Sequence, residues 1–592
     1  MKLKKYSKVL STLAVSALLL AACSDSSSSD PGKGKTAKKP EQVDTAAFPA
    51  KVSNDKADVD GSLTYGLVSD TPFEGVLNLA FYAGQPDYEV LQFFEESLLS
   101  TDDNWVYDQD GAATYELSND NKTITIKIKD NVKWHDGNPV TAEDLEYAYL
   151  VIGSPKYKGV RYDSQFQLVE GMEAYHAGKA DKISGVKVID EKTISITQTQ
   201  ANPSMLTGLW TTPLNKKYLG DVPVDQLEKS EKIRKNPIGF GPFKVKKIVP
   251  GEAVEFERFD DYWKGKPKLS SVSLKVVNPQ VAVASLEKGD IDFAVVSADQ
   301  YDQAKALKNI ELVGTVDLAY SYIGFKLGHW DADKSTAVMD NPKFADKKLR
   351  QAFAYAINNK EVGERMYKGL RFPANSVVPP SFPEYHNKDM KGYEYDPEKA
   401  KQLLDEAGYK DTNDDGLRED PNGKEFKINF ASMSGGDIQE PLTKYYIQQW
   451  KDVGLDVEML EGRLHEFNSF YERVEKDDPK IDIYMGAWGT GSDPDPSGLW
   501  ATTAPFNYPR WVNKENEELL KKGISPEAFD MEFRKDVYNQ WQELVHEEVP
   551  VIPTLFRYSL SGANKRVKGL KIKGGQVEDW YEVAVTADTP EK

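Results

Sequence analysis

The sequence predicts a mixed α/β or α+β protein whose 592 residues form more than one lobe. Residues 123–128 alternate strictly and put three isoleucines on one face, which is typical of a strand. A capping box at 141–144 precedes an apolar stripe with helical spacing, made of Leu145, Ala148, Tyr149 and Ile152. A chain of this length exceeds what one hydrophobic core supports, so roughly two to four structural units are expected.

The chain begins with the pattern of an export signal. Residues 1–22 carry a basic start, an apolar stretch from Val9 to Ala22, and small residues directly before Cys23. The apolar run is too short to span a bilayer of roughly 30 Å. The small-small-Cys ending resembles the bacterial lipoprotein box, which implies cleavage before Cys23, a diacylglyceryl group on this residue and stable anchoring by acyl chains such as palmitate. The alternative is an ordinary signal peptide with a coincidental cysteine.

Charge and composition narrow the functional classes. Residues 1–22 contain four lysines and no acid, so their removal changes the formal net charge from −19 to −23. Such a surface repels nucleic acid and anionic headgroups. With Cys23 lipidated, no thiol remains for disulfides, metal binding or nucleophilic attack. The 40% hydrophobic and 11% aromatic content predicts a globular body, and no second apolar run approaches membrane-spanning length, so we expect this body to be soluble.

The remaining elements follow in chain order. Residues 24–58 lack apolar periodicity and are interpreted as a disordered tether. Residues 186–196 predict a hairpin that turns near Asp190, and residues 349–357 predict a helix. Asp396 as cap, Pro397 at the first position and Gly408 as the stop delimit another helix. A further helix spans about 531–546, and no internal repeat is found.

A search for catalytic patterns gives no enzyme signature. The six histidines are scattered, and the sequence has no H-E-x-x-H pair, no G-x-S-x-G elbow and no G-x-x-x-x-G-K-[ST] loop. Residues 239–242 (GFGP) are glycine-rich, but a tight turn accounts for them better than a phosphate site. Carboxylates are too numerous for spacing alone to single out a glycosidase pair. We therefore expect that the protein is not an enzyme and that it binds no cofactor and no catalytic metal.

One acidic loop, at 411–422, has two interpretations. Asp411, Asn413 and Asp415 followed by Gly416 match the start of a calcium loop. The twelfth position is Asn422, where a bidentate Glu would be expected. A structural calcium ion and a simple acidic turn before a strand both remain open.

Five ordered blocks together resemble the family 5 extracellular solute-binding proteins of ABC importers, and the match covers nearly the whole chain from about residue 60. The hallmark segment is VKWHDGNPVTAEDL at 132–145. The others are NPIGFGPF at 236–243, LEKGDID at 286–292, LRQAFAYAI at 349–357, and YDPEKA through AGY at 395–409. Within the family, length, lipobox and long tether look most like Gram-positive oligopeptide-binding lipoproteins.

The resemblance implies a two-lobed periplasmic-binding-protein-like fold (type II, cluster C) with an extra domain inserted in the first lobe. We expect lobe I at 59–85, 191–325 and 550–592, the extra domain at 86–190, and lobe II at 326–549. The chain then passes between the lobes twice, near 320–325 and near 551–555. The expected hinge residues in these two segments are Tyr322, Phe325, Val551 and Thr554.

The resemblance also implies where a peptide ligand lies. An extended peptide can add to an exposed strand whatever its own sequence, and the best candidate is 483–489 (IYMGAWG), whose glycines permit close approach. In the family, a tryptophan-containing strand followed by an acid meets the peptide, and the acid pairs with the α-ammonium. Trp488 matches that tryptophan, flanked by Ala487 and Gly489. Extra Gly and Ser residues precede the acid here, so Asp493 is favoured and Asp495 is the alternative.

Other interpretations of these residues remain. Asp493 could instead cap a turn before Pro494, and Trp488 could be ordinary core. Very long peptides could also leave the ammonium pairing unused if their ends lie outside the cleft.

The implied function is capture of oligopeptides and their delivery to the permease subunits of an ABC transporter. The resemblance implies a monomeric lipoprotein anchored on the extracytoplasmic face of the cell membrane, and its length, lipobox and long tether imply a Gram-positive cell surface. Alternatives within the same fold are binding of an oligosaccharide, a nickel chelate or haem, and peptide-pheromone reception. Sugar binding would favour stacking on tryptophans such as Trp488 and Trp500.

Overall fold

A computed structural model of the chain describes residues 42–103 and 105–592. The expected signal segment 1–22, Cys23 and the tether up to residue 41 lie outside the described residues. In the described part, no helix combines the length and apolar character needed to cross a membrane.

One eleven-stranded sheet runs through both lobes, in the order β15-β14-β16-β10-β17-β9-β1-β8-β7-β6, with β13 paired to β17. The lobe I strands are β1 (Ser62–Val68), β6 (Phe243–Val249), β7 (Ala253–Arg258), β8 (Ser271–Val277) and β9 (Phe293–Val295). The lobe II strands are β13 (Arg371–Pro373), β14 (Lys427–Ala431), β15 (Asp456–Met459) and β16 (Ile483–Gly489). The fold is therefore two-lobed and mixed α/β, as predicted.

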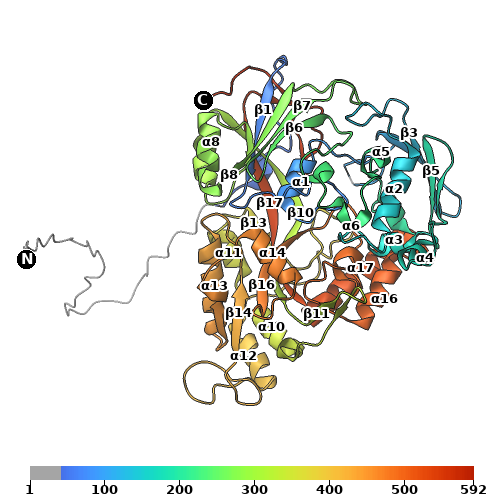
Figure 1. The fold of residues 1–592 in the computed structure, drawn as a ribbon. Helices are drawn as coiled ribbons and strands as arrows, with labels where there is room; N and C mark the ends of the chain where they lie inside the picture. The colour runs from blue at the N-terminus through green and yellow to red at the C-terminus, as the bar shows by residue number, and fades with distance from the viewer. Residues whose placement is uncertain (1–41, 104) are drawn as a thin grey trace, which may run out of the picture. The chain divides into compact units, whose positions relative to one another are not determined.

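Two long strands, β10 (Ile310–Phe325) and β17 (Val551–Asn564), belong to both lobes. They pair antiparallel from Ile310 opposite Asn564 to Gly324 opposite Val551. The ladder is irregular between Val316 and Tyr320 and again between Ser321 and Tyr322, and β10 also pairs with β16 from Ala319 onward. Figure 1 shows both strands in the middle of the chain's fold, between β1 and β8 on one side and β14 and β16 on the other.

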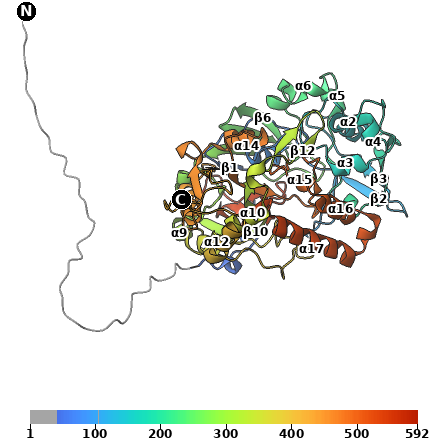
Figure 2. The same ribbon diagram turned by 90° about the horizontal axis from the view of Figure 1, so that it is seen from below.

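The extra domain is built on a separate four-stranded sheet. Its order is β2-β3-β5-β4, with β2 (Ala113–Leu117), β3 (Thr123–Ile128), β4 (Val186–Val188) and β5 (Thr193–Thr197). The three isoleucines of β3 are buried against α2 (Ala142–Ile152), whose predicted capping box is present. Figure 2 shows β2, β3 and α2–α5 grouped together.

The structure corrects the expected boundary of this domain at residue 190. That boundary falls inside the β4–β5 hairpin, and β5 pairs with both β3 and β4. The buried core of the domain also continues to Leu214, Leu227 and Phe240. The boundary is wrong because it cuts through the hairpin that the sequence predicts at 186–196, whose two strands belong to one sheet.

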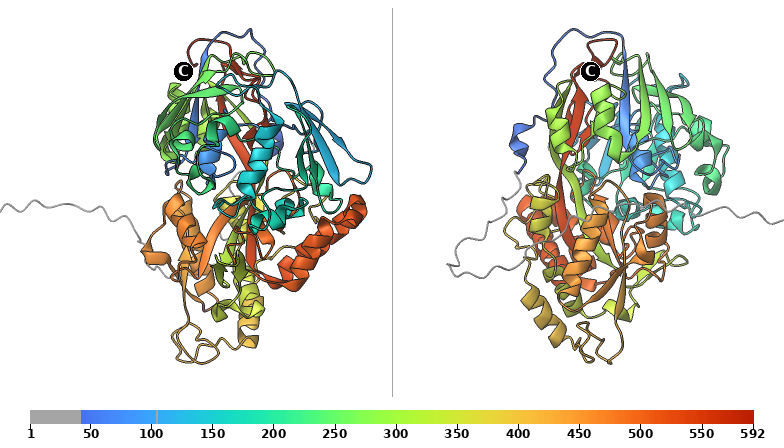
Figure 3. Two further views of the ribbon diagram at one scale, coloured as in Figure 1. Left: turned by 45° about the vertical axis from the view of Figure 1, so that its right-hand side comes forward. Right: turned by 90° about the vertical axis from the view of Figure 1, so that its left-hand side faces the viewer.

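The helices cover the sheets, and Figure 3 shows the green and blue elements of lobe I apart from the orange helices of lobe II. In lobe I and the extra domain they are α1 (Gln85–Leu91), α2, α3 (Ser164–Leu168), α4 (Met172–His176), α5 (Lys216–Leu219), α6 (Val224–Leu227), α7 (Glu231–Arg234), α8 (Ala282–Lys288) and α9 (Tyr301–Ala306). In lobe II they are α10 (Lys347–Tyr355), α11 (Asn359–Arg365), α12 (Pro397–Glu406), α13 (Gln439–Lys451), α14 (Phe467–Glu475), α15 (Ser497–Trp500), α16 (Lys514–Gly523) and α17 (Met531–Glu548).

The helix signals read from the sequence are confirmed in α12. Asp396 accepts a hydrogen bond from the Lys399 N–H, Pro397 begins the helix, and Gly408 adopts φ +88° just after it. A left-handed residue at this place satisfies the last carbonyls, which glycine does at least cost.

The expected tether is shorter than predicted. Residues 42–58 contact the folded body: the Val52 N–H donates to the Leu570 carbonyl at 3.0 Å, and the Val43 N–H donates to the Lys368 carbonyl at 2.8 Å. Val52 is buried. The segment was assigned to the tether because isolated contacts of single residues produce no apolar periodicity. The 23–58 range is therefore too long by at least these residues.

Candidate ligand-binding site

A cavity of about 1790 Å³ is lined by both lobes and by the extra domain. Sites for small molecules typically have volumes of roughly 300–1000 Å³, so this cavity accommodates a larger ligand. Part of its wall is one face of the large sheet, formed by Ala319 and Ser321 of β10, Leu555 of β17, and Ala487 and Gly489 of β16. The predicted ligand-binding residues therefore do reach a cavity.

The strand β16 offers main-chain groups to this cavity. It pairs with β10 along its whole length, but with β14 only at Ile483 and Tyr484. Beyond Tyr484, its outer edge has no ladder partner among the described residues. The Tyr471 hydroxyl contacts both main-chain groups of Ala487 on that edge, accepting from its N–H and donating to its C=O, each at 3.3 Å. This hydroxyl occupies the groups that an added strand would use.

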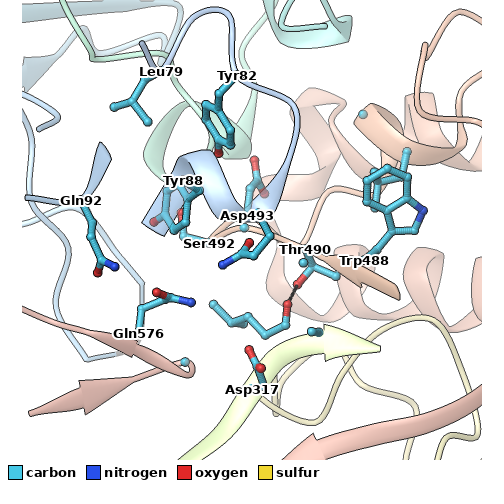
Figure 4. Close-up of a pocket in the computed structure, with 18 of the residues that line it drawn as sticks. Leu79, Tyr82, Tyr88, Gln92, Asp317, Trp488, Thr490, Ser492, Asp493 and Gln576 are labelled. Carbon is cyan, nitrogen blue, oxygen red and sulfur yellow. Dashed lines mark hydrogen bonds between the residues drawn. The ribbon is translucent and has the colours of Figure 1, made fainter. Parts of the chain in front are cut away.

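Trp488 lies at the side of the cavity in an aromatic cluster. Its ring centroid is 5.0 Å from that of Phe506 and 5.2 Å from that of Tyr508. Figure 4 shows its indole pointing away from Asp493. Trp488 is partly buried and lines the cavity, so it both packs and faces the ligand space.

Asp493 follows β16 and has one occupied and one open oxygen. Its Oδ1 accepts from the Ser204 hydroxyl at 3.3 Å and from the Asp495 N–H at 3.0 Å, and it lies 3.7 Å from Arg534 Nη2. Its Oδ2 has no hydrogen-bond partner in the part of the chain that the structure describes. A Cβ at Gly208 would overlap with Oδ2, so only glycine lets the carboxylate take this position.

Burial raises the pKa of Asp493 to about 6, because loss of solvation outweighs the attraction of Arg534. Asp495 is more fully engaged: its Oδ1 accepts from the N–H and hydroxyl of Ser497, and its Oδ2 accepts from Gln165 Nε2 at 3.1 Å. Of the two acids that the sequence left open, Asp493 is therefore the one with a free oxygen.

Polar contacts connect the lobes on both sides of the cavity. On one side, Arg534 Nη2 donates to the Ser204 hydroxyl at 2.7 Å, beside Asp493. On the other side, the Phe467 N–H donates to the Thr71 hydroxyl and Asn468 Nδ2 donates to the Pro72 carbonyl, both at 3.3 Å. The lobes thus touch around the cavity, which is a closed arrangement.

The predicted hinge residues lie in the crossing strands. Tyr322, Phe325, Val551 and Thr554 are all buried, within the part of β10 and β17 that belongs to lobe II. One irregularity of the β10–β17 ladder lies a few residues away, at Asp317–Ala319, and a second lies between Ser321 and Tyr322, where Thr554 is skipped in the pairing. Bending at these strands stays a prediction.

Several site residues were missed from the sequence, among them Ser204, Gly208, Tyr471 and Arg534. Their partners lie far away along the chain, so spacing cannot reveal them. Arg534 had one available signal: it occupies the apolar stripe of α17, together with Val537, Tyr538, Trp541 and Val545, where an arginine is unexpected.

The acidic loop at 411–422 makes its own hydrogen bonds. Glu419 accepts from the N–H and hydroxyl of Thr412 and from Asn413 Nδ2, and Asp411 accepts from the Gly416 N–H. No cluster of three or more potential metal ligands occurs in the described ranges. These contacts account for the loop as an acidic turn.

Comparisons with known proteins agree with this architecture. The family model described as "Bacterial extracellular solute-binding proteins, family 5 Middle" matches residues 108–509. The oligopeptide-binding protein OppA of Lactococcus lactis subsp. cremoris (strain SK11) is 33% identical over 602 residues, covering 98% of this chain and 98% of the relative. The oligopeptide-binding protein AppA of Bacillus subtilis (strain 168) is 28% identical, covering 93% and 92%.

Solved structures are similar over most of the fold. Lactococcal OppA complexed with an endogenous peptide in the closed conformation gives a TM-score of 0.86 at 32% identity, covering 89% of this chain and 100% of that chain. AppA from Bacillus subtilis in complex with a nonapeptide gives 0.77 at 26% identity, covering 90% and 100%. These relatives are transport components that bind solutes without catalysis. This chain belongs to the family 5 bacterial extracellular solute-binding proteins.

Proposed function

We propose that this protein captures oligopeptides between its two lobes and delivers them to the permease of an ABC transporter. The observation that carries the proposal is the unpaired edge of β16 facing a cavity of about 1790 Å³. Main-chain groups recognise an extended peptide independently of its side chains, because every peptide presents the same N–H and C=O pattern. Two relatives that span nearly the whole chain, from Lactococcus lactis and Bacillus subtilis, are oligopeptide-binding proteins.

In this proposal the peptide pairs with Ala487 and Gly489, and its α-ammonium meets Oδ2 of Asp493. The Tyr471 hydroxyl gives up its contacts with Ala487 when the peptide adds. Trp488 and its aromatic neighbours offer apolar surface to a ligand side chain. The lobes close around the peptide through bending of β10 and β17 near residues 317–325 and 551–557.

We further propose that the protein is anchored outside the cytoplasmic membrane by lipid on Cys23. Expression of the full chain with Cys23→Ser should move it from the membrane fraction to the medium. Unchanged membrane retention of this variant would refute the anchor.

The function is tested by mass spectrometry of molecules released when the protein, purified without added ligand, is denatured. A mixture of peptides supports the proposal. A single sugar or a metal chelate would instead place the protein with the non-peptide binders of the same fold. Calorimetric titration with synthetic peptides of several lengths then gives affinities.

A further inference from the structure

Two arginines face each other where the sheet lines the cavity. Arg371 of β13 pairs directly with Arg557 of β17, and both line the cavity. Paired residues on neighbouring strands lie on the same face of a sheet, so these two cations are close together. Like charges directly opposite on neighbouring strands repel each other, and a nearby anion is needed to offset this repulsion.

The one carboxylate at this place is committed to Arg557. Asp317, at the interruption of β10, forms an ion pair with the Arg557 guanidinium, and Nε of Arg557 donates to it at 2.6 Å. Asp317 is almost fully buried and borders the cavity, where Figure 4 shows it across from Tyr88 and Gln92. One negative charge therefore serves two guanidinium groups.

Arg371 forms no ion pair of its own among the described residues, and it feels the charge of Asp317 only at longer range. The only hydrogen bond of its side chain among the described residues is from Nη1 to the Ser321 hydroxyl, at 3.3 Å. The guanidinium lies over the ring of Tyr367, 4.5 Å from its centroid, which fixes its plane. Burial lowers the pKa of Arg371, and the attraction of Asp317 does not offset the loss of solvation and the repulsion from Arg557. A guanidinium has five N–H donors in a planar fork, and four of them remain available.

The other cations that line the cavity differ in this respect, because their donors are met by carboxylates or carbonyls. Their partners are Asp579 for Lys264, Glu472 for Lys476, the Leu79 and Tyr82 carbonyls for Arg161, and the Thr101 and Asp102 carbonyls for Lys573. Arg371 is thus an exception among them.

The position of Arg371 relates it to the ligand strand. Its hydrogen-bond partner Ser321 lies opposite Ala487 in the β10–β16 ladder. Neighbouring strands are about 4.8 Å apart, so Ser321 lies roughly one strand spacing from β16 and two from a peptide added to the outer edge of β16, a gap that a ligand side chain or a turning C-terminus would bridge. Planar bidentate pairing with a carboxylate is what an arginine fork favours.

We propose that Arg371 binds a carboxylate of the bound peptide, either its C-terminus or an acidic side chain, so that the protein favours peptides that bring such a group to this place. This inference rests on the proposed peptide-binding function and names a ligand preference within it.

The test uses matched peptides titrated into the full chain by calorimetry. One pair differs in a free against an amidated C-terminus, and a second pair, with amidated ends, differs in Glu against Gln at an internal position. Loss of about tenfold in affinity, or about 1.4 kcal/mol, on removing the carboxylate is expected in at least one pair. The pair that responds identifies the source of the carboxylate. Equal affinity within both pairs overturns the assignment while leaving peptide binding intact.

The variants assign the effect to this residue. Arg371→Gln should abolish the difference within the responding pair while still binding its neutral member, and Arg371→Lys should retain part of the difference. Lys476→Gln makes the same change of charge at an exposed cavity-lining cation and should leave the difference unchanged. A difference that persists in Arg371→Gln overturns the inference. If no peptide of the series binds to the unaltered protein, the proposed function itself fails.

Discussion

Replacing Asp493 with Asn removes the carboxylate proposed for the peptide's α-ammonium while keeping the side chain's shape. The Asn carbonyl can still accept from the Ser204 hydroxyl and the Asp495 N–H, which both contact Oδ1 in the structure. Arg534 keeps the Ser204 hydroxyl, the Gly523 carbonyl and the Tyr538 hydroxyl as partners. The closed arrangement should therefore persist in this variant.

The size of the expected effect follows from the pKa of Asp493. Burial raises this pKa from 3.8 to about 6, so holding the carboxylate ionised in the ligand-free site costs about 3 kcal/mol at neutral pH, at 1.36 kcal/mol per unit. A ligand ammonium at Oδ2 offsets part of this cost and adds a charge-assisted hydrogen bond. Peptides with free N-termini should lose about 2–3 kcal/mol of binding free energy, or roughly 30- to 150-fold in affinity.

The assay is calorimetric titration of the unaltered protein and Asp493→Asn with one peptide in free and N-acetylated forms. Acetylated peptide should bind both proteins within about threefold. Thr71→Ala serves as the control, since it removes the contact between the lobes at Phe467, on the other side of the cavity from Asp493, and should weaken both forms alike. An equal loss for free and acetylated peptide in Asp493→Asn would refute the ammonium role and leave this residue as a contact between lobes.

Four further outcomes are expected. A raised carboxyl pKa means that the anion disappears as pH falls through about 6, and the ligand ammonium loses its proton at roughly pH 8. Affinity for free-amine peptides should therefore be highest near pH 7 and fall by up to about tenfold per unit below 6, and a titration series in which Asp493→Asn keeps that slope would contradict this. Tyr471→Phe frees the main chain of Ala487, so stopped-flow association should be up to about threefold faster, and slower association would show that the hydroxyl assists binding instead. Ser204→Ala removes the hydroxyl that contacts both Arg534 and Asp493, so small-angle scattering should show a larger fraction of open molecules. The binding free energy should fall by about 1 kcal/mol equally for all ligands, and a loss confined to one ligand class would argue against a role in closure. Trp450→Ala empties a buried site in lobe II and should lower the free energy of unfolding by about 3–5 kcal/mol in denaturant titration, whereas a loss below about 1 kcal/mol would mean that the core refills the space.

The sequence predicted local elements well because their signals are local. The alternation at 123–128, the capping box at 141–144 and the Asp396–Pro397 start of α12 depend on neighbours within four residues, and all are confirmed. The strand 483–489 was predicted with its bounds and reaches the cavity. Contacts between distant segments were not predictable, because no spacing rule links Gly208 to Asp493 or Arg371 to Ser321. The extra-domain boundary is wrong for a different reason, since residue 190 lies inside the hairpin predicted at 186–196, whose second strand Thr193–Thr197 pairs with β3 and β4.

Because β10 and β17 pair antiparallel, lobe II is an insertion between the two strands of a hairpin. Gly324 and Val551 are opposite one another, although 226 residues separate them along the chain. Excising that insertion and joining the two strand ends by a short turn would therefore leave β10 and β17 connected as in an ordinary β-hairpin, with the strands of lobe I untouched. An ancestral one-lobed protein could have acquired its second half by insertion at such a turn, without any change in the topology of the first.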